Sequence, residues 1–200
     1  MSRDYCPQCN YPQSACICDY VQPISANTEL IVLQHPSEVG HAKNSVRLLQ
    51  LVLPATQVWV GEGDGDFAAL RQQLRASNKA IYLLYPSQVS ISANELAIQR
   101  DVILLLLDGT WRKVFRLLQL NPWLLEYPAL HLDIEAKSNY RIRKASRSDS
   151  LSSLEAAAFM LQSIEPQLDI SPLLTAFDAM VDKRIAAMPA QVRARYKDAE

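Results

Sequence analysis

The chain has 200 residues, of which 49% are hydrophobic and 20% charged, and its formal net charge is -1. This composition excludes a disordered or collagen-like chain and suffices for one compact domain with a sizeable core. The longest apolar run, Val102–Leu107, is too short for a bilayer, which takes roughly 20 residues. The polar start, soon followed by cysteines, is not typical of a secretory signal. We therefore expect a soluble, cytoplasmic protein with no membrane partner.

All four cysteines lie near the N-terminus, as a Cys-x-x-Cys pair, Cys6 and Cys9, and a Cys-x-Cys pair, Cys16 and Cys18. Four thiolates complete a tetrahedral zinc site and leave no open coordination position, so the zinc would be structural. Redox-active thiols and an iron–sulfur cluster are the alternatives. We predict a small zinc ribbon in residues 1–25, whose folding free energy comes from the metal.

Short apolar strands then alternate with amphipathic helices. Strands are predicted at residues 29–34, 57–60, 80–85, 102–107 and 129–133. Helices are predicted at residues 43–53, 67–76, 95–99, 110–120, 152–163 and 172–188, the fifth opening with a Ser-x-x-Glu capping box. This alternation predicts an α/β fold: a mostly parallel sheet with helices on both faces. The most apolar strand, Val102–Leu107, is expected at its centre.

Ligands of such sheets bind beyond the carboxyl ends of the strands. Asp108 directly follows the expected central strand, Gly109 allows a tight turn, and Thr110 can cap the next helix. From the residues alone, Asp108 either carries chemistry or merely caps that helix, and Trp111 either meets a ligand or packs in the core. Motifs for a dinucleotide or a nucleoside triphosphate are absent from the sequence.

The segment from Lys137 to Arg147 holds five basic residues and no acidic one. It is either a phosphate-binding stripe or a solvated loop. His35, at the end of the first strand, is likewise either functional or a hydrogen-bonding residue of the strand end.

Several segments together resemble the DTW-domain family, which is named after an Asp-x-Thr-Trp-like signature. They follow one another along nearly the whole chain: residues 6–18, 34–38, 44–47, 84–87, 108–113, 138–144 and 151–156. The resemblance implies that residues 26–200 form a SPOUT-like catalytic domain with a C-terminal trefoil knot. The periodicity of the sequence does not itself show a knot.

The resemblance further implies a tRNA-uridine aminocarboxypropyltransferase. Such an enzyme moves the 3-amino-3-carboxypropyl group of S-adenosylmethionine onto N3 of a uridine in tRNA, here expected in the variable loop, and releases methylthioadenosine. Asp108 would then accept the N3 proton or orient the uracil. Cofactor-binding residues are expected to be Leu84, Tyr85, Pro86, Ser87, Leu106, Leu107, Gly109, Thr110, Trp111, Ser152 and Ser153.

RNA contacts are expected from Arg47, Lys137, Tyr140, Arg141, Arg143 and Lys144. Two other functions compete with this one. A SPOUT-like RNA methyltransferase would use the same co-substrate, and a non-catalytic zinc-ribbon protein would only bind RNA. The neutral surface favours a monomer.

Overall fold

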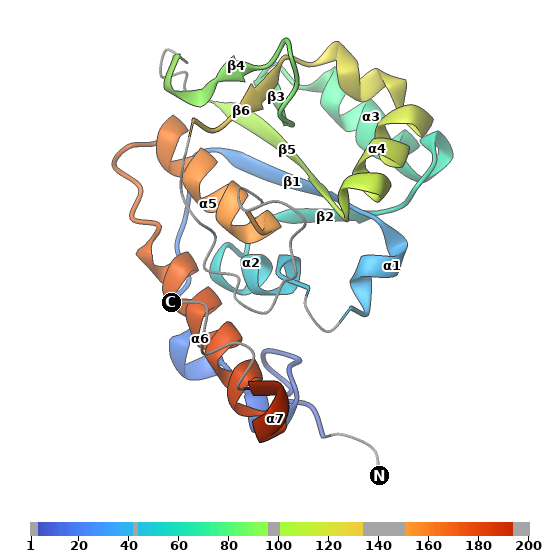
Figure 1. Ribbon diagram of the computed structural model, residues 1–200. Coiled ribbons are helices and arrows are strands. Elements are labelled where there is room, and N and C mark those ends of the chain that lie inside the picture. Colours follow the sequence, from blue (N-terminus) through green and yellow to red (C-terminus); the bar gives the residue numbers. More distant parts are fainter. Residues whose placement is uncertain (1–3, 42–43, 96–100, 134–150, 194–200) are drawn as a thin grey trace.

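The computed structural model describes residues 4–41, 44–95, 101–133 and 151–193. Six parallel strands form one sheet in the order β2-β1-β5-β3-β6-β4 (Figure 1). Their bounds are Glu29–Gln34 (β1), Gln57–Val60 (β2), Ala80–Leu84 (β3), Ile91–Ser92 (β4), Val102–Asp108 (β5) and Ala129–His131 (β6). The predicted α/β fold with a parallel sheet is confirmed.

Strand β5 lies between β1 and β3, as its apolar sequence predicts. All seven of its residues are buried. Its register with β1 pairs Leu106 with Val32 and, at the end of both strands, Asp108 with Gln34. Two polar residues therefore end neighbouring central strands at the same edge of the sheet.

Helices cover both faces of the sheet (Figure 1). Successive side chains of β5 alternate between two cores: Leu104 and Leu106 join one, and Leu105 and Leu107 the other. The first core includes α2 (Val46–Val52), α5 (Ser153–Ile164) and α6 (Ser171–Ala186), and the second includes α3 (Ala68–Ala76) and α4 (Trp111–Leu120). Two short helices, α1 (Pro36–Val39) and α7 (Ala190–Arg193), complete the described set.

The cysteine segment packs against α6, although the two are far apart in the sequence (Figure 1). Cys9, Tyr11 and Ile17 belong to the same buried core as α2 and α6. The Tyr11 hydroxyl donates to Met180 Sδ of α6 at 3.5 Å. The segment thus shares its core with the sheet domain, and the predicted boundary at residue 25 stays a prediction.

The predicted elements and the structure differ mainly at element ends. The predicted strand over residues 102–107 extends through Asp108, and the predicted helix over residues 43–53 begins only at Val46. Strand β4 and helix α1 were not predicted, because two and four residues are too few to show periodicity. Residues 96–99 of one predicted helix lie outside the described residues. So does most of the link from β6 to α5, on which the predicted knot depends.

No helix in the described ranges is long and apolar enough to cross a membrane.

Candidate functional site

The carboxylate of Asp108 is held between β1 and α5. Gln34 Nε2 donates to Asp108 Oδ2 at 2.8 Å, and the hydroxyl of Ser153 donates to Oδ1 at 2.5 Å. Asp108 is only 8% exposed, and Gln34 is also buried. Each carboxyl oxygen thus receives one side-chain hydrogen bond, which fixes the orientation of the group and leaves lone pairs that can accept a further hydrogen bond or a proton.

A second amide continues this network. Asn44 Oδ1 lies 3.4 Å from Gln34 Nε2 and accepts the backbone N–H of Val46 at 2.8 Å. Asn44 Nδ2 donates to the carbonyls of Glu38 and Val39. The amide of Asn44 is therefore oriented by backbone groups on both sides, and it in turn orients Gln34.

Asp108 is not the N-cap residue of the helix that follows it. Thr110 occupies that position in α4, and the Asp108 side chain bonds to β1 and α5. A Cβ at Gly109 would lie 3.0 Å from Lys113 Cβ, so a side chain there would require Lys113 to shift by a few tenths of an ångström. The interpretation of Asp108 as a mere helix cap is therefore not supported.

Most of the residues predicted to bind the cofactor lie at this edge of the sheet. Leu84 and Leu106 are buried cross-strand neighbours in the core that includes α5, whereas Leu107 faces the opposite core. Trp111 is 47% exposed and contacts the Tyr85 ring at a centroid distance of 6.4 Å. Trp111 is therefore not a core residue.

The loop after β3 makes its own hydrogen bonds. The backbone N–H of Ser87 donates to Ser90 Oγ at 3.0 Å, and Ser90 Oγ lies 3.0 Å from His131 Nδ1. His131 Nε2 lies 3.1 Å from Asp133 Oδ1. These contacts tie the loop after β3 to the end of β6, while Pro86 and Ser87, both predicted to bind the cofactor, are exposed.

The two serines at the start of α5 have different roles. Ser152 is the N-cap residue and forms the predicted capping box with Glu155, with bonds of 3.1 and 2.8 Å. Its hydroxyl is thus used by the helix itself, whereas the Ser153 hydroxyl points to Asp108. A carboxylate near this N-terminus is also favoured by the helix dipole.

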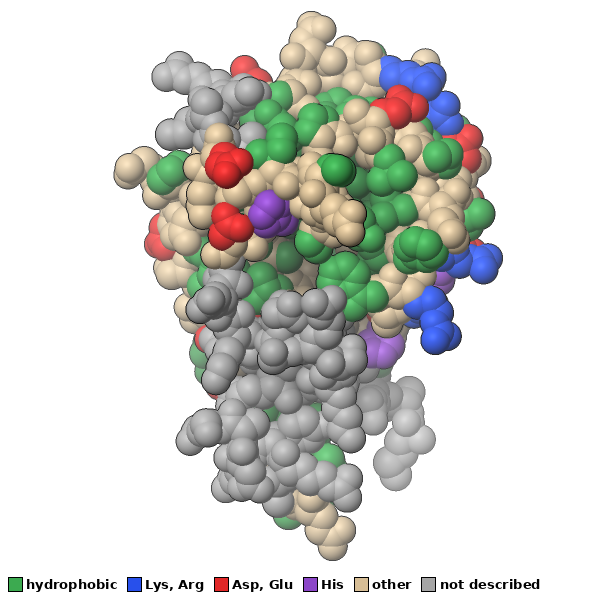
Figure 2. Space-filling model, turned by 45° about the horizontal axis from the view of Figure 1, so that its top comes forward, with side chains coloured by type: hydrophobic (Ala, Val, Ile, Leu, Met, Phe, Trp, Pro, Cys, Tyr) green, Lys and Arg blue, Asp and Glu red, His purple; other side chains and the backbone are tan. Residues whose placement is uncertain are grey.

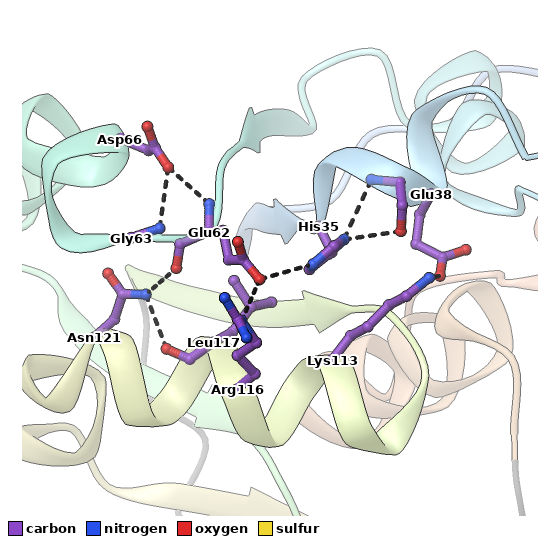
Figure 3. A network of polar contacts seen from close by, with 10 residues as sticks. His35, Glu38, Glu62, Gly63, Asp66, Lys113, Arg116, Leu117 and Asn121 are labelled. Carbon is purple, nitrogen blue, oxygen red and sulfur yellow. Dashed lines mark hydrogen bonds and ion pairs between the residues drawn. The ribbon is translucent and has the colours of Figure 1, made fainter.

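His35 lies beside this site in a separate polar network (Figure 3). His35 Nδ1 accepts the backbone N–H of Ser37 at 3.2 Å, which leaves the proton on Nε2 to donate to Glu62 Oε1 at 3.2 Å. Arg116 Nε of α4 also reaches Glu62 Oε1, at 2.5 Å. The hydrogen bond from His35, aided by Arg116, lowers the pKa of Glu62. The network joins the loops after β1 and β2 to α4.

The four cysteines form a compact cluster. Their sulfur atoms all lie within 4.8 Å of one another, with Cys6–Cys18 at 3.6 Å and Cys9–Cys16 at 3.8 Å. These distances are too long for a disulfide bond. A tetrahedral zinc ion with bonds of about 2.3 Å would separate its sulfur ligands by about 3.8 Å. The donor set and its spacing therefore fit a zinc ion.

Charge also favours a cation at the cluster. The backbone N–H groups of Cys9 and Gln8 lower the pKa of Cys6 to about 6, while the neighbouring thiols, Cys16 first among them, raise the pKa of Cys18 to about 12. Without a cation between them, the neighbouring thiols thus make ionisation of Cys18 less favourable.

Of the residues predicted to bind RNA, the structure describes Arg47 alone. Its Nη1 donates to the Asn10 carbonyl at 2.7 Å, and its guanidinium lies 5.2 Å from the centre of the Tyr11 ring. Arg47 thus joins α2 to the cysteine segment, and its contact with RNA stays a prediction. The other members, Lys137, Tyr140, Arg141, Arg143 and Lys144, lie outside the described residues.

Gln34 and Asn44 were not predicted as site residues, although both stand in segments that carry the family resemblance. Gln34 is a polar residue at the end of an apolar strand and is followed by another polar residue, His35. This position could have indicated a site residue. Nothing in the sequence indicates that its partner is Asp108.

These features define an α/β protein with a polar site at the carboxyl edge of a parallel sheet and a cysteine cluster suited to a metal ion. The DTW domain matches residues 3–185, so the chain belongs to the DTW domain family, as its motifs predict.

Relatives in animals carry the name tRNA-uridine aminocarboxypropyltransferase 2. The chain is 28% identical to the protein of Mus musculus and 26% to that of Macaca fascicularis, in both cases over 170 residues, or 82% of this chain and 57% of the relative. It is 28% identical to the protein of Drosophila melanogaster over 180 residues, which are 86% of this chain and 71% of the relative. The chain thus spans little more than half the length of the two mammalian relatives it matches.

Proposed function

We propose that this protein transfers the 3-amino-3-carboxypropyl group of S-adenosylmethionine to N3 of a uridine in tRNA, in the variable loop. The names of its relatives and its membership of the DTW domain family support this activity. The observation that carries the proposal is the buried carboxylate of Asp108, aligned by Gln34 and Ser153 at the carboxyl edge of the sheet.

In the reaction, uridine N3 forms a bond to the γ-carbon of the co-substrate, and the bond from that carbon to sulfur breaks. The electron pair of the broken bond stays on sulfur, so the leaving group is neutral methylthioadenosine. The N3 proton passes to Asp108 directly, or through water to solvent. With its two oxygens held by separate donors, Asp108 keeps one orientation toward the uracil and needs little rearrangement during the reaction.

We further propose that S-adenosylmethionine lies against the loop after β3 and the turn after β5. Leu84, Leu106 and Tyr85 are the apolar and aromatic side chains there, and the N-terminus of α5 can receive the carboxylate of the amino-acid tail. We also propose that the catalytic domain has a SPOUT-like fold. Zinc at the cysteine cluster would be structural, because four sulfur ligands leave it no open position.

The direct test uses unmodified tRNA and S-adenosylmethionine labelled separately in its methyl and carboxyl groups. The proposal expects carboxyl label, and no methyl label, in the RNA, with methylthioadenosine as the second product. Methyl label alone would identify an RNA methyltransferase and refute the proposal. Failure to transfer either label, in protein that binds both tRNA and S-adenosylmethionine, would favour a non-catalytic RNA-binding protein.

A further inference from the structure

The outer face of α4 carries aromatic side chains that the fold does not bury. Phe115 is 56% exposed and stands one turn after Trp111, which is 47% exposed. The inner face of the same helix, by contrast, buries Val114, Leu117 and Leu118 in the core. Two large aromatic side chains exposed one turn apart are a candidate surface for interaction.

A row of cations runs beside the aromatic row. Arg112 and Arg116 are both exposed and lie one turn apart, and α4 contains no acidic residue. Arg116 pairs with Glu62, and Lys113 with Glu38, whereas no acidic side chain of the described ranges forms a salt bridge with Arg112. Figure 2 shows hydrophobic and Lys or Arg side chains next to one another on the right of the view, the side on which α4 lies in Figure 1.

The position of this face relates it to the carboxylate site. Helix α4 begins three residues after Asp108, and the turn between them is tight at Gly109. The same helix is fixed to α1 by the contact of Lys113 with Glu38 and to the loop after β2 by the contact of Arg116 with Glu62 (Figure 3). The first turn of α4 therefore lies at the same edge of the sheet as Asp108, although α4 covers the opposite face of the sheet from α5.

We propose that Arg112, Phe115 and Arg116, together called the α4 face, bind the RNA substrate next to the uridine that is modified. An unpaired base stacks on Phe115, and the two guanidinium groups contact the phosphates on either side. This inference rests on the proposed function in taking RNA as the substrate. Neighbouring rows of aromatic and arginine side chains match single-stranded RNA, which offers both bases and phosphates. They match an apolar protein partner less well.

The test measures tRNA affinity, the KM for tRNA and the binding of S-adenosylmethionine in single variants. Phe115→Ala is expected to weaken tRNA binding and to raise the KM about tenfold, because loss of one stacked base costs on the order of 1–3 kcal/mol. Binding of S-adenosylmethionine is expected to be unchanged. Leu125→Ala is the matched control, since Leu125 is equally exposed but follows the far end of α4.

The salt dependence tests the cations. Arg112→Ala is expected to reduce the slope of log affinity against log salt by about 0.7–0.9, the value of one phosphate contact. Arg112→Lys should keep the slope, and Arg75→Ala, on the exposed surface of α3, should not change it.

Wild-type tRNA affinity and salt slope in both Phe115→Ala and Arg112→Ala would overturn the inference. So would a loss of self-association in Phe115→Ala with unchanged tRNA affinity, because the face would then bind a second copy of the chain. The two proposals fail separately. Wild-type protein that transfers no label, yet binds tRNA through the α4 face, refutes only the proposed activity, and transfer without any dependence on the α4 face refutes only this inference.

Discussion

The two polar clusters of this protein are built in opposite ways. The cysteine cluster takes all its members from residues 6–18, whereas the carboxylate site joins Gln34, Asn44, Asp108 and Ser153 from distant parts of the chain. The first takes its four sulfur atoms from one short segment, although that segment packs against α6. The second forms only when β1 and β5 are paired in register and α5 packs against the sheet. A local site is therefore specified by spacing, and a non-local site by tertiary packing.

The two clusters nevertheless meet at the start of α2. Arg47 in the first turn of α2 donates to Asn10, which lies between the two cysteine pairs. Asn44, just before that helix, accepts the backbone N–H of Val46 and contacts Gln34. The cysteine segment thus supports the helix end from which the carboxylate network starts.

The largest effect is expected from Asp108→Asn. The amide cannot accept a proton, and its NH₂ group opposes one of the two donors, so transfer to tRNA should fall at least 100-fold. Label incorporation at saturating substrates is the measurement. Asp101→Asn at the other end of β5 is the control, because Asp101 is exposed and its φ of 63° is one that asparagine tolerates. Near-normal transfer by Asp108→Asn would remove Asp108 from the chemistry.

Cys9→Ser is expected to break the local cluster and leave the carboxylate site in place. Bound zinc should be lost, and the melting temperature should fall on the order of 5–10 °C, because the metal contributes to the folding of the segment. Metal content by elemental analysis and thermal unfolding measure the two effects. Ser14→Ala, an exposed change in the same segment, serves as the control. Full zinc content in Cys9→Ser would show that the cluster is not the metal site.

Ser153→Ala is expected to have a smaller effect on the carboxylate site than Asp108→Asn. Removing one donor leaves Gln34 to orient Asp108, so kcat should fall about tenfold while the KM for tRNA changes little. Ser153→Thr keeps a hydroxyl and should restore most of kcat. The matched control is Ser163→Ala on the same helix, since the Ser163 hydroxyl donates to the Phe159 carbonyl of α5 itself. An equal loss in both alanine variants would indicate a general effect on α5.

The smallest effect is expected at the far end of α5, where Glu165 accepts backbone N–H groups of Asn27 and Thr28 at 3.0 and 2.6 Å. Burial raises the pKa of Glu165, but these hydrogen bonds outweigh it and hold the pKa below its ordinary value. A lowered pKa stabilises the fold above the ordinary glutamate value of about 4.3, and this contribution is lost as the pH falls through the lowered value.

Between pH 7 and pH 3, the melting temperature of Glu165→Gln should therefore fall by about 1–2 °C less than that of wild type. Glu126→Gln, a change at an exposed glutamate, is the control. Transfer activity at pH 7 should be unchanged in both variants. Identical acid sensitivity of Glu165→Gln and wild type would show that this end of α5 contributes nothing to the pH dependence.

The prediction of the fold from sequence succeeded where periodicity was strong. The run from Val102 to Leu107 is apolar on both faces, which is typical of a strand buried on both sides of a sheet. The Ser152–Glu155 capping box likewise marks the start of α5 to the residue. Strand β4 was missed, because Ile91 and Ser92 have no local pattern and form a strand by pairing with β6.

The sequence by itself determined the parallel α/β architecture and the cysteine cluster, because each follows from local pattern and spacing. The role of Asp108 in the chemistry stays a prediction. Only the tertiary structure decided which groups hold that carboxylate. Gln34 and Ser153 reach Asp108 through strand register and the docking of α5, which are long-range contacts with no signature in local spacing. The same reason applies to Trp111 and Phe115, since whether an aromatic side chain on a helix is buried depends on which face the sheet covers.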